Sequence, residues 1–451
     1  MVVKIKLLIL IFLLFFSYSA NSAQKNIIIR DAEIELFLYK IIKTVSDDHP
    51  RNGKNFEPVL ISNDEYNAFV TGSNKIYIHT GLINKSESIN EIQGVIAHEI
   101  GHLVLNHSSS RTINNENLSN YSKFATIAGI ALSASGKLNS DTTMGLIIGT
   151  QDLAAKSAFQ FSRIQEQQAD KYAIDVLRRK RISLDGVEKL MLRLSENEFL
   201  NNNSVIDYYR SHPFSKQRLE QLKKYKSNYY VPEKKNDIIN IKNFDVSLDY
   251  IKNKIKSYEN DPFEMLRKKN NNDFFSNYSK VIAYKKIGKY ELAIKTLKEL
   301  QNKYKNYPFY NELAGDIYFK KGEQKNSINE YKEAINNLGK EYIQATDLIK
   351  FSLVKSYLQT NNTKNYKECV QLLEEILRNN PNWSFLWKLL AKSSAKLGQR
   401  GISYIALAEE ALLKKNFIKA KKYVDLAFTE KTLTNSYRFR GLDILSKIKN
   451  Q

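Results

Sequence analysis

The stretch 94–107 constrains the fold most, because an apolar run there carries His98, Glu99 and His102. In a helix, His98 and His102 lie on one face, one turn apart. Two imidazoles at that spacing can bind one zinc ion, and Glu99 can reach a water molecule beside it. The alternative interpretation is two core histidines beside an unrelated glutamate. The spacing and the apolar helical context favour a metal-binding helix.

A catalytic zinc ion needs a third protein ligand, with one position left for water. The stretch 161–173 supplies Glu166 and Asp170, which share a face if this segment is helical. We predict that Glu166 binds the metal and that Asp170 accepts the outer N–H of a ligand histidine. Taken alone, such a pair would be interpreted as exposed acidic residues on a surface helix. The upstream histidine motif favours the metal-binding interpretation.

The first 23 residues have the pattern of a secretory signal peptide. Lys4 and Lys6 precede an apolar run at 7–16 that leads to small residues. That run is too short to span a bilayer comfortably, so we expect cleavage and no stable membrane span. Export would exclude nucleic acid as a partner despite the formal charge of +21, which we attribute to lysines on solvated helix faces. Cys369 is the only cysteine, so no intramolecular disulfide can form.

Three further patterns lie around the histidine motif. Residues 27–45 have apolar residues at helical spacing and predict a helix. The β-prone runs 67–72 and 75–80 flank a Gly-Ser-Asn turn and predict a hairpin, whose edge an extended peptide could join. Apolar runs at 124–134 and 144–149 predict a helical hairpin packed on the motif helix, with a mobile lid or a membrane-touching lip as the alternative.

The C-terminal half contains a repeat. Tyr284 and Gly288 recur 34 residues later as Tyr318 and Gly322. This period is typical of tetratricopeptide repeats, in which paired helices stack into a superhelix. A third unit covers 357–381, a fourth opens at Trp387, Ala391 and Gly398, and the helices after Gly401 depart from the spacing and are expected to cap the array.

These patterns predict a mostly α-helical chain with four parts. They are a signal peptide at 1–23, a helical zinc-metallopeptidase domain with a small β-sheet or hairpin at 24–225, a linker with a bridging helix at 226–272, and an α-solenoid of tetratricopeptide repeats at 273–451. The bridging helix is expected at about 246–258.

The motifs together resemble a known family. His98-Glu99-x-x-His102 followed by Glu166-x-x-x-Asp170 is similar to the membrane and periplasmic zinc proteases of the HtpX and CaaX-processing type. The match extends to Asn-Ala-Phe at 67–69, Ser-Arg at 162–163 and Ser-His-Pro at 211–213. With the signal peptide and the repeats, the resemblance narrows to periplasmic members fused to tetratricopeptide repeats.

The resemblance implies roles for individual residues. It makes His98, His102 and Glu166 the ligands of one zinc ion per chain, Glu99 the general base, and Asp170 the acid that supports a ligand. His212, before Pro213, matches a histidine that can occupy the open metal position and keep the enzyme latent, although donation to an oxyanion is the alternative. Arg218 matches an arginine suited to stabilising the oxyanion. His107 could join the site from one turn further along the helix, but we assign it to the helix surface. We assign His49 and His79 to structural roles.

The resemblance also implies a function. It implies an exported zinc endopeptidase of the periplasm that degrades misassembled outer-membrane β-barrel proteins and assists their assembly. Its repeats would dock on the barrel-assembly machinery. The alternative is a non-proteolytic periplasmic assembly chaperone or adaptor with a closed zinc site. The position of His212 distinguishes the two, because a fourth ligand that cannot be displaced would favour the chaperone.

Overall fold

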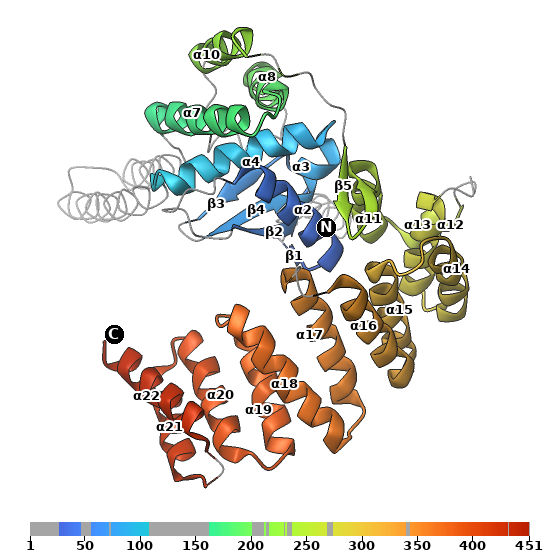
Figure 1. Cartoon of the computed structure of the whole chain (residues 1–451), viewed down its shortest axis with the longest axis vertical. Helices are drawn as coiled ribbons and strands as arrows, with labels where there is room; N and C mark the ends of the chain where they lie inside the picture. The colour runs from blue at the N-terminus through green and yellow to red at the C-terminus, as the bar shows by residue number, and fades with distance from the viewer. Residues whose placement is uncertain are drawn as a thin grey trace, which may run out of the picture.

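The computed structural model describes residues 27–46, 56–71, 74–107, 162–200, 212, 216–229, 231, 237–267, 274–339, 343–431 and 433–450. The predictions for the signal peptide, the apolar runs at 124–149 and His49 lie outside these residues. The described chain forms an N-terminal half built on a small sheet and a C-terminal array of helices that curves beneath it (Figure 1).

The sheet has four strands in the order β1-β2-β4-β3. They are β1 (Ile27–Ile29), β2 (Glu57–Ser62), β3 (Ala68–Val70) and β4 (Lys75–His79). β3 and β4 are antiparallel, which confirms the predicted hairpin, whereas β2 and β4 are parallel neighbours. β3 is therefore an edge strand, and the stacked rings of Phe69 and Tyr77, 4.9 Å apart, support its pairing with β4.

The prediction of a helix from residue 27 was wrong at its start. Residues 27–29 pair with β2 as β1, and the helix α2 covers only Ala32–Val45. Asp31 determines this boundary, because its side chain accepts a 2.9 Å hydrogen bond from the backbone N–H of Ile34. The three consecutive isoleucines are β-branched and fit a strand as well as a helix.

Helix α4 (Ile89–Val104) is the centre of the N-terminal half. Ser88 caps its N-terminus, because the Ser88 side chain accepts a hydrogen bond from the backbone N–H of Glu91. α4 and α2 cover the sheet, and α7 (Arg163–Arg179) and α8 (Asp185–Leu200) cover α4 (Figure 1). A Cβ added at Gly101 would lie 3.1 Å from the backbone of Ala169, so glycine permits the close approach of α4 to α7. Two shorter helices, α3 (Thr80–Lys85) and α10 (Lys216–Ser227), complete this half.

Residues 237–267, within the segment predicted as a linker, form regular structure. A two-stranded ribbon, β5 (Ile238–Ile241) and β6 (Phe244–Ser247), leads into α11 (Leu248–Glu259) and α12 (Pro262–Arg267). α11 is the predicted bridging helix. It carries Lys254, which is buried and contacts Asp31 at 2.8 Å and Glu33 at 2.6 Å. The segment therefore packs on the start of α2.

The C-terminal array consists of paired helices, as predicted. The pairs are α13 (Phe274–Lys286) with α14 (Tyr290–Lys303), α15 (Pro308–Lys321) with α16 (Gln324–Leu338), α17 (Ile343–Gln359) with α18 (Thr363–Asn379), α19 (Ser384–Lys396) with α20 (Arg400–Leu413), and α21 (Phe417–Thr429) with α22 (Asn435–Lys449). Gly288, Gly322 and Gly398 follow the first helix of three pairs with φ of 74°, 88° and 73°. This left-handed conformation ends a helix and favours glycine, which explains the glycine in the 34-residue period.

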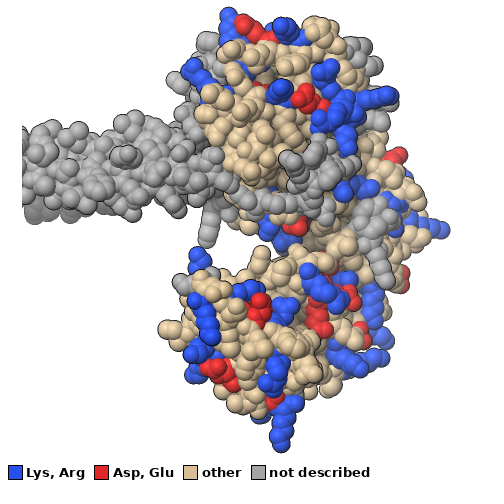
Figure 2. Space-filling model, turned by 60° about the vertical axis from the view of Figure 1, so that its left-hand side comes forward, with Lys and Arg blue, Asp and Glu red and all other residues tan. Residues whose placement is uncertain are grey.

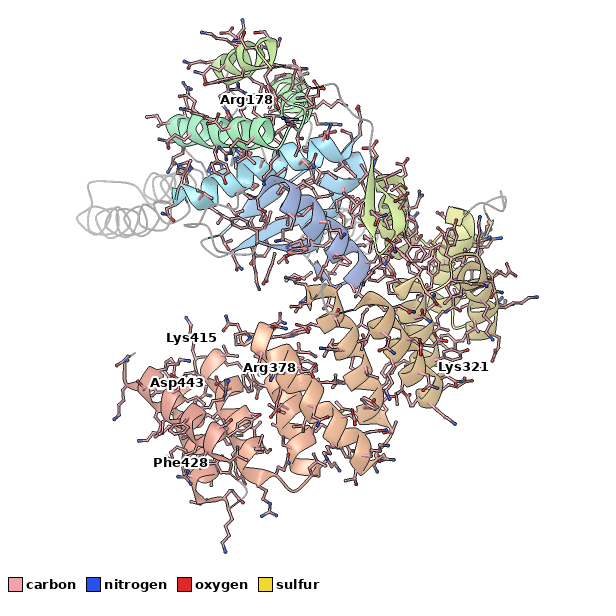
Figure 3. All side chains as sticks on the ribbon, viewed as in Figure 1. Arg178, Lys321, Arg378, Lys415, Phe428 and Asp443 are labelled. Atoms are coloured by element: carbon pink, nitrogen blue, oxygen red, sulfur yellow. The ribbon has the colours of Figure 1, made fainter. Side chains whose placement is uncertain are left out.

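Charge is spread over the face of the molecule shown in Figure 2. Lysine and arginine occur on both halves of the face shown in Figure 2 and do not gather in one patch. Figure 3 shows three of these basic side chains far apart. Arg178 lies in the N-terminal half, and Lys321 and Lys415 lie toward opposite sides of the array. This distribution agrees with lysines on solvated helix faces. Among the described helices, none combines the length and hydropathy needed to cross a membrane.

Candidate metal centre

Four buried side chains converge between α4 and α7. His98 and His102 come from α4, Glu166 comes from α7, and His212 comes from a bend further along the chain. One potential ligand atom from each lies within 4.8 Å of the others. His98 Nε2 is 3.1 Å from His102 Nε2 and 3.2 Å from His212 Nδ1, which is itself 3.1 Å from Glu166 Oε1. The structure therefore brings together the predicted ligands and His212.

The spacing of these atoms fits a small cation. Ligands at ~2.0–2.1 Å from a tetrahedral zinc ion lie ~3.3–3.4 Å from one another. The carboxylate oxygens of Glu166 lie 3.4 Å from His98 Nε2 and 3.3 Å from His102 Nε2, close to that value. His98 Nε2 contacts the other two ring nitrogens, so the three cannot all carry protons, and lone pairs point into the cluster. Imidazole nitrogens with a carboxylate are a donor set that zinc prefers.

The charges of the site suit a cation as well. Burial raises the pKa of the Glu166 carboxyl, but His212 and Arg218 outweigh this effect and hold the pKa well below its usual range. Burial lowers the pKa of His102 well below its usual value, which keeps this imidazole neutral with a lone pair. Burial also disfavours the charged form of His98, yet Asp170 and Glu166 raise its pKa to about 10. The surrounding carboxylates thus favour positive charge at the cluster.

Asp170 and Arg218 support the ligands from behind. Asp170 Oδ1 lies 3.0 Å from His98 Nδ1, where it can fix the tautomer of that ring. The buried Arg218 donates to both oxygens of Asp170 at 2.6 and 2.8 Å, and its Nη1 lies 2.9 Å from Glu166 Oε2. Arg218 therefore forms ion pairs with two carboxylates. Its role in stabilising an oxyanion stays a prediction.

Glu99 lies on the far side of His212 from the ligand set. Its side chain is fully buried, and its Oε1 is 3.3 Å from His212 Nε2. The His212 ring therefore faces the ligands with Nδ1 and the predicted base with Nε2. In this arrangement the imidazole occupies the place next to Glu99 where a reacting water molecule would be needed.

The prediction that His107 lies on the helix surface was wrong. Its side chain is buried, with Nδ1 3.0 Å from His102 Nδ1 and Nε2 3.0 Å from Gln168 Oε1. α4 ends at Val104, and Asn106 adopts a left-handed φ of 57°, which turns the chain back toward the site. Asparagine can adopt this left-handed conformation just after a helix, so Asn106 was the residue in the sequence that indicated a turn before His107. Gln168 was not identified from the sequence.

The other histidines do not join the cluster within the described residues. His79 is buried on β4, 3.6 Å from Glu65 Oε2 and against the ring of Phe69. These contacts are consistent with its predicted structural role. His49 lies outside the described residues.

The site and its surroundings match a metallopeptidase family. Residues 31–226, which contain all four residues of the cluster, match the model of peptidase family M48. The match and the site together make the chain a metalloprotease.

Individual relatives extend the likeness beyond that domain. The chain is 24% identical over 360 residues to the beta-barrel assembly-enhancing protease of Escherichia coli (strain K12), covering 78% of this chain and 70% of the relative. The protein of the same name from Yersinia pestis is 22% identical over 371 residues, covering 79% and 71%. Metalloprotease YcaL of Escherichia coli (strain K12) is 26% identical over 186 residues, covering 41% and 67%. The first two matches are longer than the family M48 segment, so they include part of the chain outside it.

Proposed function

We propose that this chain is a zinc-dependent endopeptidase of the periplasm that acts in envelope protein quality control. The observation that carries the proposal is the convergence of His98, His102 and Glu166 beside the buried carboxylate of Glu99. The three ligands would hold one zinc ion per chain. Bound zinc supplies Lewis-acid chemistry, polarising a peptide carbonyl and activating water near neutral pH.

The protein's own side chains divide the remaining work. Glu99 takes the proton of the attacking water molecule and passes it to the leaving amine. Asp170 holds the ring of His98, and Arg218 holds both Asp170 and Glu166 in place. A substrate in extended conformation pairs with the edge strand β3, which contacts α4. Main-chain pairing of this kind accepts many sequences, provided that the substrate is unfolded.

His212 keeps the resting enzyme latent in this proposal. Its Nδ1 completes a four-residue ligand set, and its Nε2 contacts Glu99. The ring thereby excludes water from both the metal and the base. Activation requires displacement of His212 when a substrate enters.

Substrates and partners follow from the relatives that the chain resembles. Two of them are named for enhancing beta-barrel assembly. We propose that the substrates are misassembled outer-membrane β-barrel proteins and that the helical array docks on the barrel-assembly machinery. In this proposal residues 1–23 are a cleaved signal peptide, 24–225 the protease domain, 226–272 a connecting segment, and 273–451 tetratricopeptide repeats.

One observation favours a second function. His212 completes the ligand set. If His212 were never displaced, the site would stay closed, and the protein would be an assembly chaperone or adaptor without proteolytic activity. Cleavage of any unfolded substrate by the purified chain in a zinc-dependent manner decides against this alternative.

Metal removal tests the proposed function. We expect residues 24–451 to carry one zinc ion per chain and to cleave casein, to lose cleavage after treatment with a chelator, and to regain it when zinc is returned. Glu166→Ala, purified in parallel, controls for contaminating proteases, since it should fail to recover. A metal-free wild-type chain, or cleavage that persists in Glu166→Ala, would contradict the proposal.

A further inference from the structure

We infer that His107 and Gln168 position the metal ligand His102 through a directed hydrogen-bond chain. His102 Nδ1 lies 3.0 Å from His107 Nδ1, and His107 Nε2 lies 3.0 Å from Gln168 Oε1. The inference rests on the proposed metal site and adds two positioning residues to it.

The positions of the ring protons determine which atom donates in each hydrogen bond of this series. A cation at the cluster requires a lone pair on His102 Nε2, so the proton of this neutral ring must sit on Nδ1. That N–H points at His107 Nδ1, which must accept and therefore carries no proton. The proton of His107 then sits on Nε2 and is donated to Gln168 Oε1. Every ring nitrogen along this line has one role, and no two protons face each other.

The backbone is shaped to make these contacts. If α4 continued, His107 would point about 140° around the helix from His102, because five residues make about 500° of turn. The left-handed Asn106 redirects the chain, and the His107 ring returns to pack on His102 with ring centroids 5.1 Å apart. Gln168 reaches the same line from α7, two residues after the ligand Glu166. The hydrogen bonds from His102 through His107 to Gln168 thus link α4 to α7.

The two ligand histidines of α4 are held differently. His98 is backed by the carboxylate of Asp170, which Arg218 partly neutralises, whereas His102 is backed by a neutral imidazole and an amide. A neutral acceptor orients the ring without adding a further negative charge to a site that already contains Glu166 and Asp170. Loss of the acceptor should leave His102 free to rotate or to change tautomer, which weakens metal binding.

Replacement of His107 separates positioning from packing. His107→Phe keeps a ring without an acceptor, whereas His107→Asn keeps an acceptor near the position of Nδ1. We expect zinc affinity, measured by competition with a chromophoric chelator, to fall roughly 10–100-fold in His107→Phe and to recover most of that loss in His107→Asn. Gln168→Met should cause a smaller loss. Gln167→Met, at a neighbouring glutamine that bonds Gln217, should bind zinc like wild type.

The tautomers provide a test that needs no variant. In the zinc-loaded wild-type chain labelled with ¹⁵N-histidine, long-range ¹H–¹⁵N spectra should show His107 protonated at Nε2 and His102 protonated at Nδ1. An Nδ1-protonated His107, or equal zinc affinity of His107→Phe and wild type, would overturn this inference and leave the proposed function standing. Absence of zinc binding by the wild-type chain would instead overturn the proposed function.

Discussion

Each buried charged side chain at the metal centre has a partner that fixes its charge or its orientation. Asp170 faces His98, Arg218 faces both acidic residues, and His212 bridges the ligand set to Glu99. Such partners are needed because an unpaired charge is costly to bury. The residues nearest the reaction can therefore be separated by experiment into those that bind metal and those that orient a ligand.

Glu166 and Asp170 should differ in their effect on metal binding. Glu166→Ala removes the only carboxylate of the ligand set and leaves the buried Arg218 charge beside the three imidazoles, so it should abolish stable zinc binding. Asp170→Ala removes only the acceptor for His98 Nδ1 and should weaken zinc affinity by roughly 10–100-fold. Metal analysis after gel filtration, with folding checked by circular dichroism, measures both. Full zinc retention by Glu166→Ala would mean that another residue is the third ligand.

His212 should restrain the resting enzyme. In His212→Ala the remaining ligands still hold zinc, and water can occupy the position beside Glu99. We expect faster cleavage of an unfolded substrate and more self-cleavage than in wild type. Initial rates on casein at equal zinc content measure the effect. A loss of activity would assign His212 to the oxyanion instead.

At the scale of helices and strands, α11 fixes how the N-terminal half joins the array. Lys254 on α11 contacts Asp31 and Glu33 at the start of α2, and the hydroxyl groups of Tyr250 and Tyr307 also donate to Glu33. Tyr307 precedes α15 of the array, so one buried carboxylate connects three parts of the chain. Helix α11, within the segment expected to be a linker, is therefore buried against both halves.

Removal of Lys254 should destabilise this junction strongly. Lys254→Ala leaves Glu33 buried without its cation, which costs roughly 3–5 kcal/mol of the free energy of unfolding. Chemical denaturation followed by circular dichroism measures the loss. Lys256→Ala, at an exposed position on the same helix, is the control and should change stability little. Equal stability of the two variants would show that the junction is held by other contacts.

Local patterns in the sequence predicted the elements but not all their contacts. Four predicted features depend only on residues close together in the sequence, and the structure has them as expected. They are the spacing of His98 and His102, the acidic pair on α7, the β3–β4 hairpin and the helix pairs. His107 was assigned to the helix surface, and its burial beside His102 was not predicted, because a single left-handed residue breaks the helical extrapolation. The pairing of β2 with β4 and the burial of Lys254 depend on residues distant in sequence, which periodicity does not encode.

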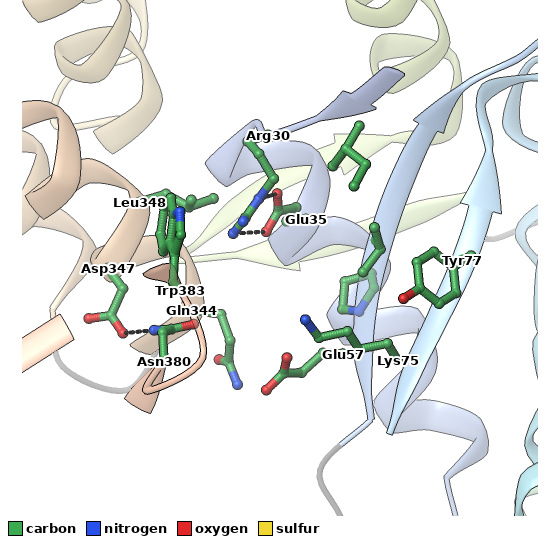
Figure 4. Close-up of a pocket in the computed structure, with 13 residues that line it drawn as sticks. Arg30, Glu35, Glu57, Lys75, Tyr77, Gln344, Asp347, Leu348, Asn380 and Trp383 are labelled. Carbon is green, nitrogen blue, oxygen red and sulfur yellow. Dashed lines mark hydrogen bonds and ion pairs between the residues drawn. The ribbon is translucent and has the colours of Figure 1, made fainter. Parts of the chain in front are cut away.

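Across the whole molecule, the array contacts the sheet at a second place. A cavity of about 150 Å³ lies there between β1, β2 and β4 on one side and α17 with the segment after α18 on the other (Figure 4). Arg30 forms an ion pair with Glu35 at 2.7 Å, and its guanidinium lies 5.0 Å from the ring of Trp383 in the array. Asn380 donates to Asp347 on the array side.

Glu35 should make stability depend on pH near neutrality. Burial raises its pKa to about 7, although Arg30 opposes the shift. The folded chain then binds this proton more tightly than the unfolded chain, so the contribution of Glu35 to stability falls as pH rises from about 4.5 to about 7. Glu35→Gln removes the dependence. We expect the free energy of unfolding of this variant, relative to that of wild type, to increase by on the order of 2 kcal/mol from pH 5 to pH 8. Denaturation of both proteins at the two pH values measures it, and an unchanged difference would contradict the account.

The most direct test of the whole account compares wild type with Glu99→Gln. Glutamine keeps the size of the side chain and leaves every proposed ligand in place, but it cannot take a proton from water. We predict one zinc ion per chain in both proteins, casein cleavage by wild type, and no cleavage by Glu99→Gln. Undiminished cleavage by a zinc-loaded Glu99→Gln chain, measured beside the inactive Glu166→Ala preparation, would contradict the assignment of this site as the catalytic centre.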